Sequence, residues 1–173
     1  TDASRINVTI DGIPLNDPES QQVFWVDLPD LASSVENIQV QRGVGTSSNG
    51  AGAFGATISI QTKNPENEPF ARISSSAGSY NTFKNMVEAG TGLLADRFTL
   101  QMRVSDLKSD GFVERTGSDH RSAHISTLFR NERMRLKANF LLGEEHTGIG
   151  WWGVPGEMMA VNRRHNPAGE FTD

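Results

Sequence analysis

The sequence contains no cysteine, a single tyrosine, and no apolar run near the roughly 20 residues that a membrane-spanning helix needs. Without cysteine, disulfide bridges and thiolate chemistry are excluded. Acidic residues outnumber basic ones by 21 to 16, and the net charge of -5 argues against broad electrostatic binding to nucleic acid. With 36% hydrophobic residues, the composition is that of an ordinary soluble domain. Strands of a membrane β-barrel, apolar on one face only, give an equally weak hydropathy signal.

The segment "NGAGAFG", residues 49–55, has the G-x-G-x-x-G spacing of a dinucleotide-binding turn. Such a turn works because a helix begins directly after it and offers its N-terminal N–H groups to the pyrophosphate. Here the following "ATISIQTK" places Ile58 and Ile60 two positions apart, which predicts a strand. We therefore expect no nucleotide site. Residues 43–56 are interpreted as a loop between two strands, whose small residues let other backbone lie close.

The first 63 residues are predicted to form a mixed α/β piece. Apolar residues alternate from Ile6 to Ile10 and are followed by Asp11-Gly12, a strong signal for a two-residue hairpin turn. The segment "LPDLASSVENI" predicts a short helix with Asp30 as its N-cap.

From residue 70 onward, segments of about ten residues alternate between apolar and polar side chains, the length that a tilted strand needs to cross a bilayer. The apolar sets of the three clearest strands are Phe98, Leu100, Met102 and Val104; Ala123, Ile125, Thr127 and Phe129; and Met134, Leu136, Ala138, Phe140 and Leu142. Short connectors alternate with long ones, as in outer-membrane barrels. If these sets face lipid, Phe98 and Phe129 lie at the same level. A water-soluble sandwich that buries the same faces remains the alternative.

The stretch "VENIQVQRGVGTSSNGAGAFGATISIQTK" resembles the end of the plug domain of TonB-dependent outer-membrane receptors. There V-E-R-I-E-V-x-R-G-P is followed by S-x-x-Y-G and then A-x-G-G-x-I-N-I-x-T-K. "RINVTIDGIPLND" resembles the preceding V-L-x-D-G-x-P-L-N segment. The chain departs from this pattern at Gln39, Val44, Asn49 and Ala56.

The resemblance implies a mainly β chain with three parts. Residues 1–63 would be the second half of a mixed α/β plug, 64–69 a linker, and 70–173 the first antiparallel strands, about five, of an incomplete transmembrane β-barrel. Because the family's barrel has about 22 strands, the chain is interpreted as a fragment of a bacterial outer-membrane protein. The glycine-rich segment would then pack plug backbone closely within the barrel.

The parent protein would bind a scarce solute and import it with energy from the TonB complex, which would engage a segment absent from this chain. Glycan importers of the superfamily usually read L-K-D-A-S where this chain has "VQRGV", which favours an iron chelate, haem or cobalamin as the solute. The other expected partner is outer-membrane lipid. The alternative is a soluble all-β ligand-binding module without a transport role.

The resemblance also suggests site residues. Those assigned to the plug motif and plug–barrel contact are Arg42, Gly43, Gly50 and Gly55. Those assigned to ligand contact are Phe24 and Trp25 in a plug loop, and Trp151 and Trp152 in an extracellular loop. Those assigned to the lipid-facing surface are Phe98, Leu100, Met102, Val104, Ile125, Phe129, Leu136 and Phe140. Alternatively, Arg42 only holds the fold, Phe24 and Trp25 pack inside the plug, and the later tryptophans lie at the headgroup level.

No catalytic, cofactor or metal site is expected. Ser118 precedes "DHRSAH" without a nucleophile elbow or any other catalytic framework. His120, His146, Met158 and Met159 lack the spacing of a metal or haem site. We therefore interpret the chain as part of a receptor and not as an enzyme.

Overall fold

The computed structural model describes residues 2–44, 54–150 and 152–167, and the chain divides into two compact units, Thr1–Pro65 and Glu66–Asp173. Both units are built mainly from β-strands. In the described part of the chain, the helical residues form three 3-10 turns and a four-residue α-helix. The expected mainly β fold class is confirmed, with a four-stranded sheet in the first unit and consecutive antiparallel strands that form an open sheet in the second.

The first unit contains a four-stranded sheet in the order β2-β1-β4-β3. Its strands are β1 (Ile6–Ile10), β2 (Ile13–Pro14), β3 (Val35–Arg42) and β4 (Ala56–Thr62). β1 runs parallel to β4, and β3 runs antiparallel to it. The core beneath this sheet consists of Val8, Ile10, Leu31 and Ile60, because the apolar positions of β1 and β4 alternate onto one face.

The predicted hairpin at Asp11-Gly12 is confirmed. β1 pairs with β2 antiparallel, and both turn residues have positive φ, 49° for Asp11 and 83° for Gly12. This is the conformation that a two-residue hairpin turn requires and that the Asp-Gly pair favours.

The helical segments of the first unit are the 3-10 turns η1 (Ala3–Arg5), η2 (Trp25–Asp27) and η3 (Leu31–Ser34). The predicted short helix is present as η3, and Asp30 lies at its N-cap position, but its side chain does not cap the helix. Asp30 has a left-handed backbone and makes no side-chain bond to the N–H groups of η3; its carboxylate accepts from Ser33 Oγ at 2.6 Å. The segment does not extend into a capped α-helix because β3 begins at Val35, directly after η3.

The strand predicted after the glycine-rich segment is confirmed, since β4 begins at Ala56, directly after Gly55. Gly55 is therefore followed by extended backbone and not by the helix that a dinucleotide site requires. Gly50, which was assigned to the plug motif, lies outside the described residues.

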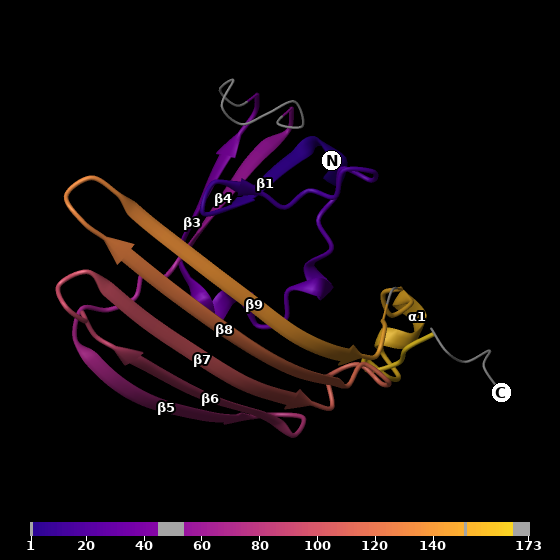
Figure 1. The fold of residues 1–173 in the computed structure, drawn as a ribbon. Helices are drawn as coiled ribbons and strands as arrows, with labels where there is room; N and C mark the ends of the chain where they lie inside the picture. Colours follow the sequence, from indigo (N-terminus) through magenta and orange to yellow (C-terminus); the bar gives the residue numbers. More distant parts are fainter. Residues whose placement is uncertain (1, 45–53, 151, 168–173) are drawn as a thin grey trace. The chain divides into compact units, whose positions relative to one another are not determined.

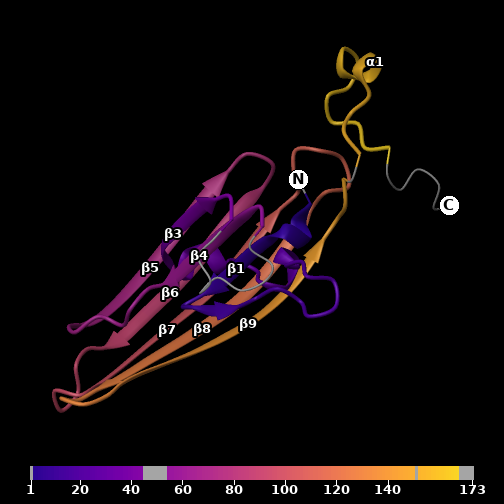
Figure 2. The same ribbon diagram turned by 90° about the horizontal axis from the view of Figure 1, so that it is seen from above.

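The second unit is a five-stranded antiparallel sheet in which each strand pairs with its neighbour in sequence, as predicted. The strands are β5 (Pro69–Gly78), β6 (Thr82–Thr91), β7 (Phe98–Ser109), β8 (Ser118–Arg130) and β9 (Arg135–Thr147). They form one curved, open layer (Figure 1). The short helix α1 (Gly156–Met159) lies beyond the end of β9 in both views (Figures 1 and 2).

The register of the sheet aligns the apolar positions of β7, β8 and β9 in rows. The four rows are Phe98–Phe129–Leu136, Leu100–Thr127–Ala138, Met102–Ile125–Phe140 and Val104–Ala123–Leu142. The expectation that Phe98 and Phe129 share one level is confirmed, because they are direct cross-strand partners. The turns at 92–97 and 131–134 close this end of the sheet, and residues 110–117 and the segment after β9 lie at the other end.

Candidate functional site

The two faces of the β5–β9 sheet have opposite character. One face carries buried polar side chains, such as Arg103, whose exposure is 2%. The other carries exposed apolar side chains, such as Phe140 and Leu142, at 60% and 68%. The buried polar set on the first face comprises Glu88, Thr99, Gln101, Arg103, Ser105, Ser122, His124 and Ser126. This is the reverse of a water-soluble sheet, which buries its apolar face.

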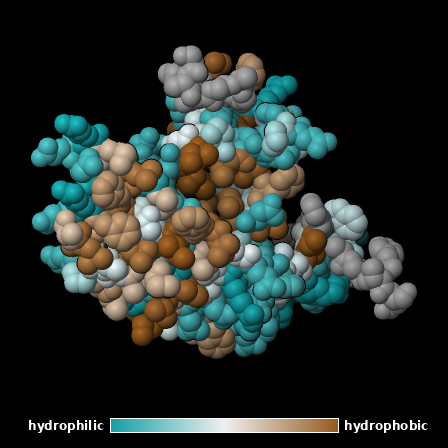
Figure 3. Space-filling model, in the orientation of Figure 1, coloured by the Kyte–Doolittle hydropathy of each residue, from teal (hydrophilic) through white to brown (hydrophobic). Residues whose placement is uncertain are grey.

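All eight residues assigned to the lipid-facing surface share the apolar face, by strand alternation and register. Phe98, Met102, Val104, Leu136 and Phe140 are exposed, whereas Leu100, Ile125 and Phe129 are half-buried. In the space-filling view, hydrophobic residues gather over the middle of the strands and hydrophilic residues lie toward both ends of the sheet (Figure 3). A continuous exposed apolar surface of this kind marks a surface that is covered in the assembled protein.

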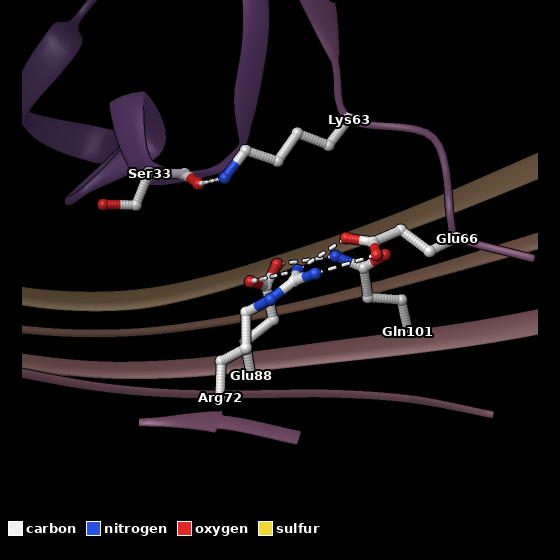
Figure 4. Close-up of polar contacts among 6 residues, drawn as sticks. All are labelled: Ser33, Lys63, Glu66, Arg72, Glu88 and Gln101. Atoms are coloured by element: carbon white, nitrogen blue, oxygen red, sulfur yellow. Dashed lines mark hydrogen bonds and ion pairs between the residues drawn. The ribbon is translucent and has the colours of Figure 1, made fainter. Parts of the chain in front are cut away.

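On the polar face, four residues join the linker to the sheet; we call Glu66, Arg72, Glu88 and Gln101 the linker anchor. Arg72 on β5 donates two hydrogen bonds to the Glu66 carboxylate, at 2.5 and 2.9 Å. The same guanidinium lies 3.8 Å from Glu88, which is 5% exposed. Gln101 on β7 donates to Glu88 at 2.6 Å. Figure 4 shows the chain of contacts, from the linker to β5, β6 and β7.

Backbone and aromatic contacts support the linker anchor. The ring of Phe70 covers Gly90, its cross-strand partner, so closely that a Cβ at residue 90 would lie 2.5 Å from the ring. The Arg72 guanidinium stacks over this ring at 4.1 Å, a cation–π arrangement. In the linker, the carbonyl of Asn67 accepts from the N–H of Leu93 at 2.7 Å. These contacts fix the point at which the chain enters β5.

In the first unit, the end of β4 is held by a carboxylate. Asp11, in the hairpin turn, accepts from Thr62 N at 2.9 Å and from Thr62 Oγ1 at 2.5 Å, and Thr62 is 1% exposed. The next residue, Lys63, donates to the carbonyl of Ser33 at 2.9 Å (Figure 4). Thr62, the last residue of β4, is therefore bonded to the hairpin turn, and Lys63, directly before the linker, is bonded to η3.

The described plug-motif residues make backbone contacts. Gly43 has φ +84°, which favours glycine, and its N–H donates to Gly55 O at 2.9 Å. Gly55 N donates to Arg5 O at 2.8 Å, and a Cβ at residue 55 would lie 3.2 Å from that oxygen. Gly55 thus permits a close approach of two backbones. Arg42, the last residue of β3, is exposed, and among the described residues no carboxylate lies within ion-pair distance of it.

The predicted ligand contacts lie on exposed segments. Phe24 and Trp25, at the start of η2, are 52% and 49% exposed. The loop before them is organised by Asn16, which accepts from Val8 N at 2.8 Å. Hydrogen bonds from the backbone of Ser20 lower the pKa of Asp17 in the same loop. Both contacts give this exposed loop a defined conformation.

Trp152 is 62% exposed and lies in the segment after β9, whereas Trp151 falls outside the described residues. This segment is fastened to the 110–117 loop. Arg164 Nε donates to Phe112 O at 2.8 Å, and Asn166, fully buried, donates to Glu114 O at 2.8 Å. The segment that carries Trp152 is therefore joined to the 110–117 loop at the end of the sheet opposite the linker.

Sequence reasoning missed the linker anchor. The sequence signal for it lies in the segments of β5 and β6, where Arg72 and Glu88 occupy polar positions of alternating strands. Once the turn at 79–81 defines the hairpin, the register places these opposite charges directly across from each other. Glu66 could not be found in this way, because it lies in the linker, where no strand periodicity applies.

Within the described residues, no helix is long and apolar enough to cross a membrane. In the same part of the chain, no group of three or more His, Cys, Asp or Glu side chains could hold a metal ion.

Comparison with known proteins relates the first unit to one family. The TonB-dependent Receptor Plug Domain matches residues 1–57. The metal-pseudopaline receptor CntO of Pseudomonas aeruginosa is 33% identical over 69 residues, which is 40% of this chain and 10% of that protein. The chain thus spans about a tenth of the length of this curated relative.

Solved structures extend the likeness to most of the chain. The copper transporter OprC superimposes with a TM-score of 0.68 at 18% identity, over 87% of this chain and 24% of that one. The ferric-catecholate import receptor Fiu of E. coli K12, in its open form, gives 0.65 at 21% identity, over 85% of this chain and 21% of that one. At these identities the likeness concerns the fold. Residues 1–57 thus match the plug-domain family of TonB-dependent receptors, and the chain has the fold of a fragment that joins part of such a plug to the first strands of an outer-membrane barrel.

Proposed function

We propose that the parent protein is an active-transport receptor that binds a scarce solute at the cell surface and imports it with energy supplied by TonB. In this proposal, residues 1–63 are the second half of the plug, 64–69 the linker, and 70–173 the first barrel strands with their loops. The observation that carries the proposal is the sheet with a buried polar face and an exposed apolar face, joined to a plug-family segment. A wall of this polarity separates lipid from a polar lumen.

The lipid-facing residues of this wall are the eight apolar side chains named above, from Phe98 to Phe140. The exposure of five of them in the open sheet, Phe98, Met102, Val104, Leu136 and Phe140, supports the assignment, because a soluble protein would bury this face against a second sheet. The opposite face, with Gln101, Arg103 and His124, would line the lumen. The linker anchor lies on that face, and its role would be to fix where the plug joins the wall.

The solute is proposed to be a metal chelate. The motif "VQRGV" departs from the pattern of glycan importers, and the curated relative is named for a metal-pseudopaline complex. An iron chelate, haem and cobalamin all belong to the solutes that the motif favours. The relative's name supports a chelated metal ion within this group. Exposed Phe24, Trp25 and Trp152, with Trp151, are proposed as contacts, because aromatic side chains bury much apolar area against a ligand.

Arg42, Gly43, Gly50 and Gly55 are proposed as plug-motif residues. In this proposal, the exposed Arg42 guanidinium pairs with a carboxylate of a barrel strand that this fragment does not include. Gly43 and Gly55 support the proposal through the positive φ and the close backbone approach that they permit.

A transport assay tests the function. Cells that lack the gene, complemented with the full-length receptor, should take up radiolabelled metal supplied as a chelate, and should lose this uptake when TonB is deleted. A panel of iron chelates, haem, cobalamin and an oligosaccharide identifies the solute class. Uptake of none of them, or uptake that does not depend on TonB, would contradict the proposal.

The alternative, a soluble binding module, is tested by extraction. The full-length receptor should stay with the outer-membrane fraction and leave it only in detergent. A chain that is monomeric in buffer without detergent would support the soluble module.

A further inference from the structure

The turn end of the β5–β9 sheet, which lies away from α1 (Figure 1), carries a row of arginines. Arg97 directly precedes β7, Arg130 ends β8 and Arg135 begins β9. Arg130 and Arg135 are direct cross-strand partners, and the N–H of Arg130 donates to the carbonyl of Arg97 at 2.8 Å. Because Phe129 and Leu136 belong to the lipid-facing set, strand alternation places Arg130 and Arg135 on the opposite, polar face.

An open pocket lies between this row and the turn at 131–134. Its volume is about 660 Å³, within the range of roughly 300–1,000 Å³ that is usual for small-molecule sites. The lining residues all have polar or charged side chains: Asp96, Arg97, Arg130, Asn131, Glu132 and Arg133. Three guanidinium groups therefore face two carboxylates, and the pocket carries a net positive charge.

The arginines of this pocket lack the carboxylate partners of ordinary surface ion pairs. Among the described residues, no carboxylate lies within ion-pair distance of Arg97, Arg130 or Arg133. This holds although Asp96 and Glu132 are the direct sequence neighbours of two of them. Like charges gathered at the ends of neighbouring strands destabilise a sheet. A bound anion would offset this repulsion, so the pocket favours an anionic ligand.

Backbone contacts hold both turns of the pocket in place. Asn131 Oδ1 accepts from the N–H groups of Arg133 and Met134, at 2.9 and 2.8 Å. In the other turn, the N–H of Leu94 donates to the carbonyl of Phe98 at 2.7 Å. Turns that are already ordered lower the entropic cost of capturing a ligand.

The pocket adjoins the linker. Arg130 Nη2 donates to Asn67 Oδ1 at 3.4 Å, and the carbonyl of Asn67 accepts from the N–H of Leu93 at 2.7 Å. The pocket therefore lies beside the point at which the chain enters β5. Because short turns of outer-membrane barrels are periplasmic, this point would be at the periplasmic end of the lumen in the proposed receptor.

We propose that this pocket is an exit-side site, in which the three guanidinium groups hold an imported metal chelate of net negative charge before it enters the periplasm. The inference rests on the proposed transport function and narrows the solute to chelates that present acidic oxygens. A guanidinium offers a planar fork of N–H donors, which matches the two oxygens of a carboxylate or phosphate. A solute without such oxygens would gain nothing from this fork.

The two carboxylates of the lining suit a site of transit. Asp96 and Glu132 each adjoin an arginine in sequence, and their charges reduce the net attraction for an anion. A solute that passes through a pore must bind strongly enough to enter a site and weakly enough to leave it. All six lining residues are exposed, so water and salt weaken each charge interaction further.

The test places a nitroxide spin label in the full-length receptor through Ala95→Cys, in the turn that carries Arg97, and measures its paramagnetic relaxation. The probes are gadopentetate, a dianionic gadolinium chelate with carboxylate oxygens, and gadoteridol, a neutral one. Gadopentetate should relax the label in a saturable manner at low ionic strength. Gadoteridol should act only in proportion to its concentration, through collision.

Variants connect the signal to the pocket. Arg133→Gln should lower the affinity for gadopentetate about two- to fivefold, the effect of one exposed ion pair. A combined variant, with Arg97, Arg130 and Arg133 all replaced by Gln, should show no saturation. Glu132→Gln removes a neighbouring negative charge and should raise the affinity. The matched control is Lys108→Gln, which removes one exposed positive charge at the loop end of β7 and should leave the affinity unchanged.

Other outcomes would overturn the inference. Equal relaxation by the two probes would show collision without binding. An equal loss with Lys108→Gln and Arg133→Gln would show a general charge effect. No saturation in the wild type would show that a part of the receptor outside this chain already pairs with the arginines. Heat-modifiable migration in gel electrophoresis checks folding. If the combined variant does not fold, Arg133→Gln decides, since its side chain has no bond among the described residues.

Solute uptake separates this inference from the transport function. Cells with the combined variant should bind the imported chelate at their surface as the wild type does but import it more slowly, because a cationic site raises the local concentration of an anion. Unchanged import would overturn the exit role. Import restricted to a solute without net negative charge would overturn this inference and leave the transport function standing. Saturable gadopentetate binding in a receptor that imports nothing would contradict the transport proposal and leave the anion site standing.

Discussion

Phe140→Arg should strongly destabilise the full-length receptor. The main cause would be the free-energy cost of placing a charged side chain in the bilayer, since few packing contacts within the protein are lost. Phe140 belongs to the third of the four apolar rows and is 60% exposed in the open sheet, so few protein contacts are lost. An arginine on the lipid face costs about 2–4 kcal/mol at the bilayer midplane and about 0–1 kcal/mol near its surfaces. The expected loss at residue 140 is therefore about 2–4 kcal/mol, or roughly 30- to 700-fold in the folding equilibrium.

Leu136→Arg is expected to cost less, although it lies on the same strand and face. The register places Leu136 in the row of Phe98 and Phe129, next to the turn at 131–134. That row, with Phe129 before the turn and Leu136 after it, lies at the edge of the apolar band, where an arginine side chain can reach the headgroups. We therefore expect a loss of about 0–1 kcal/mol at this position.

The measurement is equilibrium unfolding of the receptor in lipid vesicles with urea, together with the amount of folded protein in outer membranes. Asn139→Arg is the matched control: the same new side chain, one residue away, on the polar face, where the loss should stay below about 1 kcal/mol. Equal losses at residues 139 and 140, or a larger loss at 136 than at 140, would refute the assigned faces or the position of the apolar band.

Gly43→Ala should destabilise the full-length receptor by about 1 kcal/mol, because residue 43 has φ +84°; Gly156→Ala in α1, where no such φ occurs, should have little effect in the same unfolding assay. Asp11→Ala should cost about 1.5–3 kcal/mol, since it removes the charged acceptor of two hydrogen bonds from buried Thr62; an unchanged midpoint would show that this pair does not hold the end of β4. Trp152→Ala should leave unfolding unchanged and weaken chelate binding about tenfold in a fluorescence titration; unaltered affinity would remove Trp152 from the ligand contacts.

The elements of the fold were largely predictable because strand alternation repeats along the chain. Period-two alternation in β7, β8 and β9 indicates both the strands and which residues share a face. The Asp11-Gly12 pair fixes one hairpin turn through its backbone preference. The alignment of Phe98 with Phe129 could also be predicted from the sequence, because neighbouring antiparallel strands of similar length leave little freedom in register.

The candidate site was less predictable because it depends on contacts between elements. The pairing of Arg72 with Glu66 depends on the conformation of a proline-containing linker, and propensities do not fix this conformation. Asp30 fits the pattern of an N-cap, but a strand begins too soon after it for an α-helix to form. Exposed aromatic residues such as Phe24 and Trp152 follow no periodicity, so sequence alone could not place them.

The parallel pairing of β1 with β4 has a mechanical consequence. A pulling force applied to the chain before β1, and resisted at the linker after β4, would act along both strands in opposite directions. The ladder from Ile6↔Ala56 to Ile10↔Ile60 would then be loaded in shear, so its hydrogen bonds would share the load. Separation one pair at a time, as in unzipping, would need a pull from the same end of both strands. The first unit is thus arranged to resist tension along the chain until this whole ladder yields together.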